Sequence, residues 1–89
     1  MAKREFKIVN EKGLHARASA KFVEVVEEFD ARATVSRDGM DVSGDSIMGL
    51  LMLAASRGTN IEVVTEGEAA TELADALEAL VANRFGEDY

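Results

Sequence analysis

The chain has 89 residues, neither cysteine nor proline, and a formal net charge of −7. A chain of this length forms one domain with a modest core, and the lack of cysteine excludes disulfides and thiolate metal sites. The acidic balance argues against binding to nucleic acid or to an anionic membrane, and no apolar run resembles a signal peptide or a membrane span, so we expect a cytoplasmic protein.

The first half of the chain predicts a strand, a helix and a strand hairpin. Residues 5–9 alternate between polar and apolar side chains, which indicates a strand. From Ala16 to Phe29 the apolar residues follow helical spacing, and we expect the helix to end at Asp30. Residues 33–36 and 40–42 then predict two strands joined by an Asp-Gly turn.

The second half predicts a helix, a strand and a helix. Ser46 is suited to cap a helix over the apolar run 47–55, which Arg57-Gly58 is expected to close. A strand follows over residues 60–65, and a helix over residues 70–81. The order βαββαβα predicts a single α+β domain over residues 1–89, with a four-stranded sheet, three helices on one face and the other face open to solvent.

The only histidine, His15, lies immediately before the first predicted helix, with Arg17 two residues later. A helix N-terminus carries unpaired N–H groups and a positive dipole end, so it favours anions. The free N–H groups of residues 16–19 and the guanidinium of Arg17 are therefore placed to hold a phosphoryl group on the imidazole, and Gly13 permits a tight turn before it. The alternative interpretation is a surface histidine at a helix N-cap.

Two segments carry a resemblance to a known family. Gly-Leu-His-Ala-Arg at 13–17 is similar to the phosphorylation-site motif of the HPr family, the phosphocarriers of the phosphoenolpyruvate-dependent phosphotransferase system. Residues 45–53 resemble the regulatory-serine region of the same family. The resemblance covers essentially the whole chain, and it implies an antiparallel sheet in strand order 1-4-2-3, an open-faced β-sandwich with three helices.

The resemblance also implies the roles of the site residues. His15 is the phosphoryl acceptor through its δ nitrogen, and Arg17 neutralises the phosphate. Enzyme I is the donor and a IIA-type domain is the acceptor. Such a protein is a stoichiometric carrier and not an enzyme, and we expect a monomer that needs no cofactor and binds no metal.

The apolar run after Ser46 is expected to include a docking surface, because a short helix in a two-layer domain cannot bury every side. Partner contacts are expected at Ile47, Met48 and Leu51, and, since the resemblance also places contacts on the first helix, at Ala16 and Ala20. The alternative is that the apolar residues of this run are all core. By resemblance, Ser46 is a regulatory phosphorylation site whose partner is HPr kinase/phosphorylase.

The sequence departs from the family at a few positions. Ala18 stands where most members have proline, and Glu24 and Glu27 stand where many sugar-transport members carry basic residues. The acidic residues favour a nitrogen-type branch of the phosphotransferase system. The alternative function is a regulatory interaction module of the same fold that acts through the Ser46 helix.

Two pairs of carboxylates raise the question of acid–base catalysis. Asp38 with Asp41, and Glu66 with Glu68, are interpreted as solvated surface and not as residues of a cleft.

Overall fold

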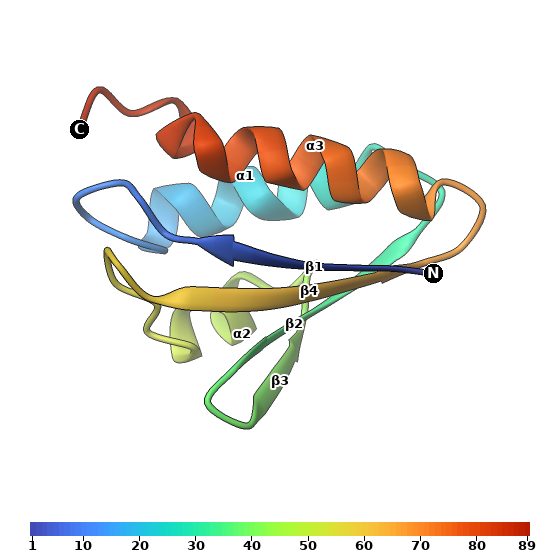
Figure 1. Cartoon of the computed structure of the whole chain (residues 1–89), viewed down its shortest axis with the longest axis horizontal. Helices are drawn as coiled ribbons and strands as arrows, with labels where there is room; N and C mark the ends of the chain where they lie inside the picture. The colour runs from blue at the N-terminus through green and yellow to red at the C-terminus, as the bar shows by residue number, and fades with distance from the viewer.

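The computed structural model describes residues 1–89 and contains four strands and three α-helices (Figure 1). In chain order these are β1 (Ala2–Lys7), α1 (Ala16–Glu27), β2 (Arg32–Arg37), β3 (Met40–Ser43), α2 (Ile47–Met52), β4 (Asn60–Glu66) and α3 (Ala70–Ala82), followed by a 3-10 turn, η1 (Arg84–Gly86). The predicted order βαββαβα is confirmed.

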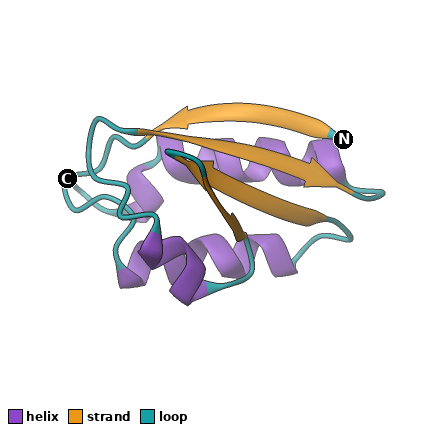
Figure 2. Cartoon of the chain, turned by 90° about the horizontal axis from the view of Figure 1, so that it is seen from below, coloured by secondary structure: helices purple, strands orange, loops and turns teal.

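All neighbouring strands pair antiparallel, in the order β1-β4-β2-β3 that the family resemblance implied. The central strand β4 pairs Ile61 with Phe6 of β1 and Val63 with Val35 of β2. Because side chains alternate along a strand, this register puts all four residues on the same face of the sheet. Figure 2 shows the helices gathered on one side of the strands, which leaves the other side open.

The hydrophobic core fills the space between the sheet and the helices. Its largest fully buried apolar side chains come from all three helices, the 3-10 turn, the covered face of the sheet and the residue that follows β1: Phe22, Phe85, Ile8, Leu50, Ile61, Leu73, Leu77, Val35 and Val63. The alternate residues of the strands, such as Glu5 and Lys7, point to the other face of the sheet and are exposed. The predicted two-layer, open-faced architecture is therefore confirmed.

The first strand and two helix ends differ from the sequence prediction. Strand β1 spans Ala2–Lys7 and not residues 5–9, so it begins earlier and ends before Ile8. Helix α1 stops at Glu27, before Asp30, and α2 stops at Met52, before the predicted end near residue 55. Helix α2 cannot continue because Ala54 adopts a left-handed conformation with φ of 50°, which a right-handed helix cannot contain. The turn lets Leu53 and Ala55 point into the core, both nearly inaccessible to solvent.

Gly13 bends the chain just before the first helix. Its φ is +66°, and a Cβ built on it would lie 2.5 Å from the carbonyl oxygen of Ala55. The next residue, Leu14, donates its N–H to that same carbonyl at 2.9 Å. The tight turn predicted at Gly13 is confirmed, and it ties the loop after β1 to the segment after α2.

Replacing Gly13 with Ala is expected to destabilise the protein through both backbone strain and a backbone clash. The matched control is Gly58→Ala, because Gly58 also has positive φ, of +89°, but has no atom within 4 Å of a built Cβ. We expect the control to lose about 1–2 kcal/mol of unfolding free energy from strain, and Gly13→Ala to lose roughly 1 kcal/mol more. Urea denaturation measures both, and equal losses would contradict the clash.

Candidate functional site

His15 occupies the N-cap position of α1, and its side chain makes no capping hydrogen bond. Its carbonyl accepts the N–H of Ser19 at 2.8 Å, while the N–H groups of Ala16, Arg17 and Ala18 have no acceptor within the protein. The prediction that residues 16–19 are all free is therefore wrong for Ser19, which closes the first turn of the helix. Since the N–H of Ala18 is unpaired, the proline usual at this position would forfeit no hydrogen bond.

The imidazole of His15 lies against a carboxylate that the sequence analysis missed. Nε2 of His15 contacts Oε2 of Glu87, from the C-terminal segment, and the two side chains are 27% and 7% exposed. The other carboxylate oxygen of Glu87 accepts a hydrogen bond from Nδ2 of Asn10 at 3.0 Å. In Figure 1 the C-terminal end and the loop after β1 lie at the same end of the molecule.

Glu87 stays ionised more readily than an ordinary glutamate. Burial alone would raise its pKa, but the hydrogen bonds from Asn10 and His15 outweigh that effect, with help from the charges of His15 and Lys12, and the pKa is lowered below its usual value. An ionised carboxylate only accepts hydrogen bonds, so its partner nitrogen on the imidazole is a donor.

Arg17 is exposed, and its guanidinium makes no hydrogen bond or ion pair with another residue. It stands in the first turn of α1, beside the unpaired N–H groups. A guanidinium can bind phosphate oxygens through two parallel hydrogen bonds. The start of α1 therefore combines a histidine, three unsatisfied donors and a free cation.

Ser46 caps α2, as predicted. Its hydroxyl oxygen accepts the N–H of Gly49 at 3.0 Å. Ser46 is half-buried and belongs to a polar turn in which Ser43 donates to Asp45 at 2.5 Å. A phosphate at this hydroxyl would lie at the N-terminus of a helix, where negative charge is favoured.

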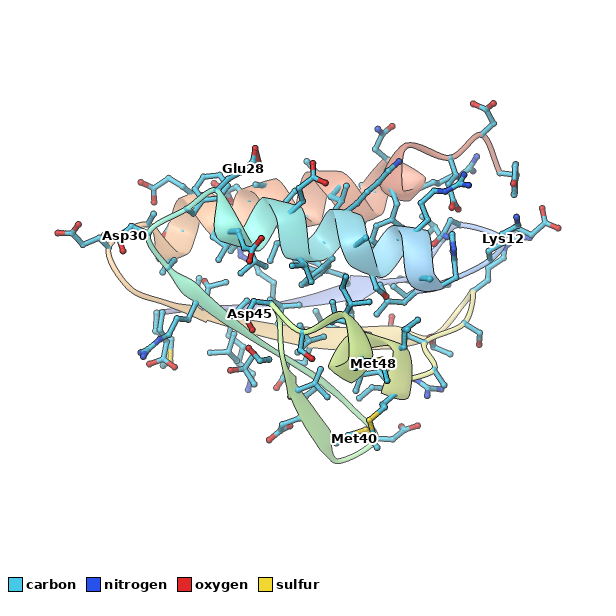
Figure 3. All side chains as sticks on the ribbon, turned by 180° about the vertical axis from the view of Figure 1, so that it is seen from behind. Lys12, Glu28, Asp30, Met40, Asp45 and Met48 are labelled. Carbon is cyan, nitrogen blue, oxygen red and sulfur yellow. The ribbon has the colours of Figure 1, made fainter.

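Helix α2 presents exposed apolar side chains to solvent. Ile47 is 41% exposed, Met48 71% and Met52 65%, and we call these three residues the α2 patch. Leu51 is half-buried, and the sequence analysis did not single out Met52. Figure 3 shows Met48 on the same side of the molecule as Met40, which lies at the β2–β3 turn.

Of the two residues of α1 expected at a partner surface, Ala16 is exposed and Ala20 is half-buried. Farther along, Glu24 and Glu27 of α1 and Glu28 just after its end are exposed and form no salt bridge. Helix α1 therefore begins at the unpaired N–H groups and continues into an acidic outer face.

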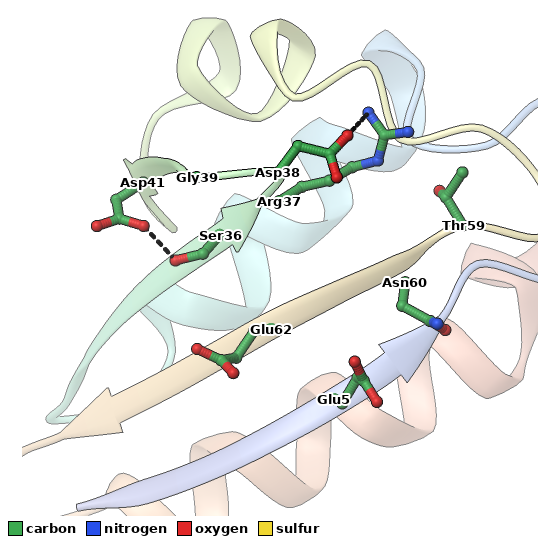
Figure 4. Close-up of a pocket in the computed structure, with 9 residues that line it drawn as sticks. All are labelled: Glu5, Ser36, Arg37, Asp38, Gly39, Asp41, Thr59, Asn60 and Glu62. Carbon is green, nitrogen blue, oxygen red and sulfur yellow. Dashed lines mark hydrogen bonds and ion pairs between the residues drawn. The ribbon is translucent and has the colours of Figure 1, made fainter.

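Asp38 and Asp41 border an open hollow, and both are exposed, in line with their interpretation as solvated surface. Nine residues surround the hollow on the open face of the sheet, none of them hydrophobic (Figure 4). Asp41 accepts a hydrogen bond from Ser36 at 2.6 Å, and Asp38 pairs with Arg37 at 3.5 Å while its side chain stays 82% exposed. Both carboxylates remain solvated, and His15 and Arg17 are not among the lining residues.

No cluster of three or more His, Cys, Asp or Glu side chains is arranged to hold a metal ion. None of the helices combines the length and the apolar character that crossing a membrane requires.

The fold and the site together define a class of protein: an open-faced α+β domain that presents one histidine at a helix N-terminus. Residues 2–83 match the family described as "PTS HPr component phosphorylation site". The chain is 47% identical over 87 residues to phosphocarrier protein HPr of Cupriavidus necator, covering 98% of each chain. It is 48% identical over 84 residues to that of Pseudomonas aeruginosa, covering 93% of each.

The solved structures agree with these relatives. HPr-C-His from Thermoanaerobacter tengcongensis superposes with a TM-score of 0.95, at 35% identity and with full coverage of both chains. The catabolite repression HPr of Bacillus subtilis, Crh, matches with a TM-score of 0.63 at 33% identity, over 90% of this chain and 95% of that one. The chain belongs to the HPr family of phosphocarrier proteins of the phosphotransferase system.

The lowered pKa of Glu87 predicts how stability depends on pH. The folded protein binds a proton at this carboxylate less tightly than the unfolded chain, whose reference pKa is 4.5. The stabilisation is therefore fully present above that value, and it is lost as the pH falls through the lower pKa of the folded state. We expect the difference in unfolding free energy between wild type and Glu87→Gln to be constant near neutral pH and to shrink below about pH 4.5.

Urea unfolding at a series of pH values measures this difference. The control is Asp88→Asn, because Asp88 is the exposed neighbour of Glu87 and makes no hydrogen bond or ion pair. If the difference in unfolding free energy between wild type and Glu87→Gln stayed constant at pH values well below the reference pKa of 4.5, the lowered pKa of Glu87 would be contradicted.

Proposed function

We infer that this protein accepts a phosphoryl group on His15 from Enzyme I, which phosphoenolpyruvate charges, and passes it to IIA-type domains. The observation that carries this inference is the position of His15 at the start of α1, beside three unpaired N–H groups and the free guanidinium of Arg17. Membership of a family of phosphocarriers supports the same role.

Phosphoryl transfer depends on how the protein positions the phosphoryl group and neutralises its charge more than on catalytic side chains. Phosphoryl transfer passes through a loose transition state with negative charge on the phosphoryl oxygens. The N-terminal N–H groups of α1 and the guanidinium of Arg17 are the groups that stabilise those oxygens. Because each phosphoryl group received must be handed on before the next, the protein acts as a stoichiometric carrier, and it requires no cofactor of its own.

The carrier role predicts a gain of one phosphate when the protein is mixed with Enzyme I, Mg²⁺ and phosphoenolpyruvate. Intact-mass spectrometry is expected to show one acid-labile phosphoryl group on the wild type and none on His15→Ala. Arg17→Ala is expected to accept the group about tenfold to a thousandfold more slowly, because it removes one preorganised cationic donor. An unmodified wild type with a competent Enzyme I would contradict the proposed function.

We propose that the α2 patch is part of the surface that meets the partner proteins and that Ser46 regulates it. Exposed Ile47, Met48 and Met52 give an apolar area that suits docking, and methionine adapts to partners of different shape. The carbonyl of Ala55, just after α2, holds the N–H of Leu14, so the patch and His15 belong to connected segments. A phosphate on Ser46, added by an HPr kinase/phosphorylase, would place negative charge on that surface.

Two variants at Ser46 separate the effect of charge from the effect of capping. Aspartate and asparagine are both good N-cap residues, so both preserve α2, but only aspartate adds a negative charge. We expect Ser46→Asp to slow phosphoryl transfer from Enzyme I roughly several-fold, more at low salt than at high salt, and Ser46→Asn to behave like the wild type. Equal rates for the two variants would contradict regulation by charge.

A regulatory interaction module remains the second candidate, because the chain also matches Crh, a catabolite repression HPr. Such a module would bind its targets through the α2 patch without turnover at His15. Binding to those targets would then survive His15→Ala, whereas phosphoryl transfer by a carrier would not.

A further inference from the structure

We propose that Glu87 is a positioning residue that holds Nε2 of His15, so that Nδ1 is presented to the phosphoryl donor as the nitrogen with the free lone pair. This inference rests on the proposed function and deepens it. It assigns a role to the C-terminal segment, which lies 72 residues from the histidine in sequence.

The first support is a continuous set of contacts behind the imidazole. Oε2 of Glu87 contacts Nε2 of His15, and Oε1 accepts a hydrogen bond from Nδ2 of Asn10 at 3.0 Å. The same Nδ2 donates to the carbonyl of Gly13 at 2.8 Å, and Asn10 is fully buried. The carboxylate is therefore fixed from the loop that carries the histidine, and it is not a free surface group.

The second support is the backbone turn that places Glu87 beside His15. Arg84, Phe85 and Gly86 have φ values of 56°, 55° and 80°, three successive left-handed residues that turn the chain back after α3. Left-handed conformations cost free energy in non-glycine residues, and they persist only where surrounding contacts hold them. Here Phe85 is completely buried, and its carbonyl accepts a hydrogen bond from Nζ of Lys21 at 2.6 Å.

The end of the segment is held as well. Nζ of Lys12 lies 5.4 Å from the centre of the Tyr89 ring, within the range of a cation–π contact. Lys12 is also the other charged group, besides His15, that acts on Glu87. Contacts therefore fix the segment before and after Glu87, and both Lys12 and Asn10 come from the loop that leads to His15.

The chemical consequence follows from the donor and acceptor roles. An ionised carboxylate requires a hydrogen on Nε2, which in the neutral ring leaves the lone pair on Nδ1. In the transfer, that lone pair forms the new N–P bond, while the bond from phosphorus to the donor's leaving atom breaks and its electron pair stays with that atom. The ring becomes positively charged with Nε2–H in place, and Glu87 stabilises this charge as the carboxylate does in catalytic triads.

Two substitutions separate orientation from charge. Glu87→Met keeps the length of the side chain but removes the acceptor, and Glu87→Gln keeps an acceptor oxygen but removes the charge. Asp88→Asn is the matched control, since Asp88 is the exposed neighbour and makes no hydrogen bond or ion pair. A ¹⁵N-edited NMR spectrum of the amide groups shows first that each variant is folded.

The test measures two quantities in each variant: the Hε2 resonance of His15 and the rate of phosphorylation by Enzyme I. In the wild type and in Asp88→Asn at neutral pH, we expect a protected Hε2 resonance of His15 with Nδ1 unprotonated. This resonance is expected to disappear in Glu87→Met and to persist in Glu87→Gln. Single-turnover phosphorylation by Enzyme I is expected to slow by about tenfold to a hundredfold in Glu87→Met at saturating donor, and by less in Glu87→Gln.

Three results would overturn the proposal: no protected Hε2 signal in the wild type, an Hε2 signal that survives in Glu87→Met, or unchanged phosphorylation in folded Glu87→Met. The last result would make the contact a purely structural link of the C-terminal segment. Failure of the wild type to accept any phosphate would contradict the carrier function instead, while the Hε2 signal would still decide whether Glu87 holds the ring.

Discussion

The position of His15 depends on one close backbone approach, between Gly13 and the carbonyl of Ala55. Only a residue without Cβ fits there, and the N–H of Leu14 donates to that carbonyl. With Leu14 buried and its amide satisfied, the chain enters α1 at His15 with the imidazole partly exposed. This contact joins the loop after β1 to the segment after α2, so the histidine and the α2 patch lie on segments that a backbone hydrogen bond connects.

One of the two imidazole nitrogens, Nε2, is already occupied by the contact with Glu87. Glu87 contacts Nε2, while the unpaired N–H groups and Arg17 belong to the start of α1. An anionic group on the same nitrogen as Glu87 would be repelled, since like charges at hydrogen-bond distance destabilise each other. The arrangement therefore leaves Nδ1 as the favourable place for a phosphoryl group. Because Glu87 contacts Nε2, it favours the ring with hydrogen on Nε2 and leaves Nδ1 unoccupied for the incoming phosphoryl group.

Local sequence patterns were sufficient for most of the fold but not for the complete site. The Asp38-Gly39 turn and the cap at Ser46 depend on near neighbours in the chain, and the structure contains both. The alternation in residues 5–9 indicated the first strand but placed it too late, since β1 spans Ala2–Lys7. The end of α2 was missed because the left-handed turn at Ala54 serves the burial of Leu53 and Ala55, which is a tertiary requirement. Glu87 was missed for the same reason, since nothing in its own neighbourhood indicates a contact with His15.

Ser46 is placed so that a change of charge need not disturb the fold. Its hydroxyl oxygen caps α2 through the N–H of Gly49, and a phosphate at a helix N-terminus interacts favourably with the helix dipole. The core residue Leu50 and the turn after α2 would keep their contacts, so the connection from Ala55 to Leu14 would persist. A phosphate there would therefore act through space, on the approach of a partner to the α2 patch, and the geometry of His15 itself would stay the same. If the α2 patch is the proposed docking surface, the position of Ser46 suits control by charge and not by a change of fold.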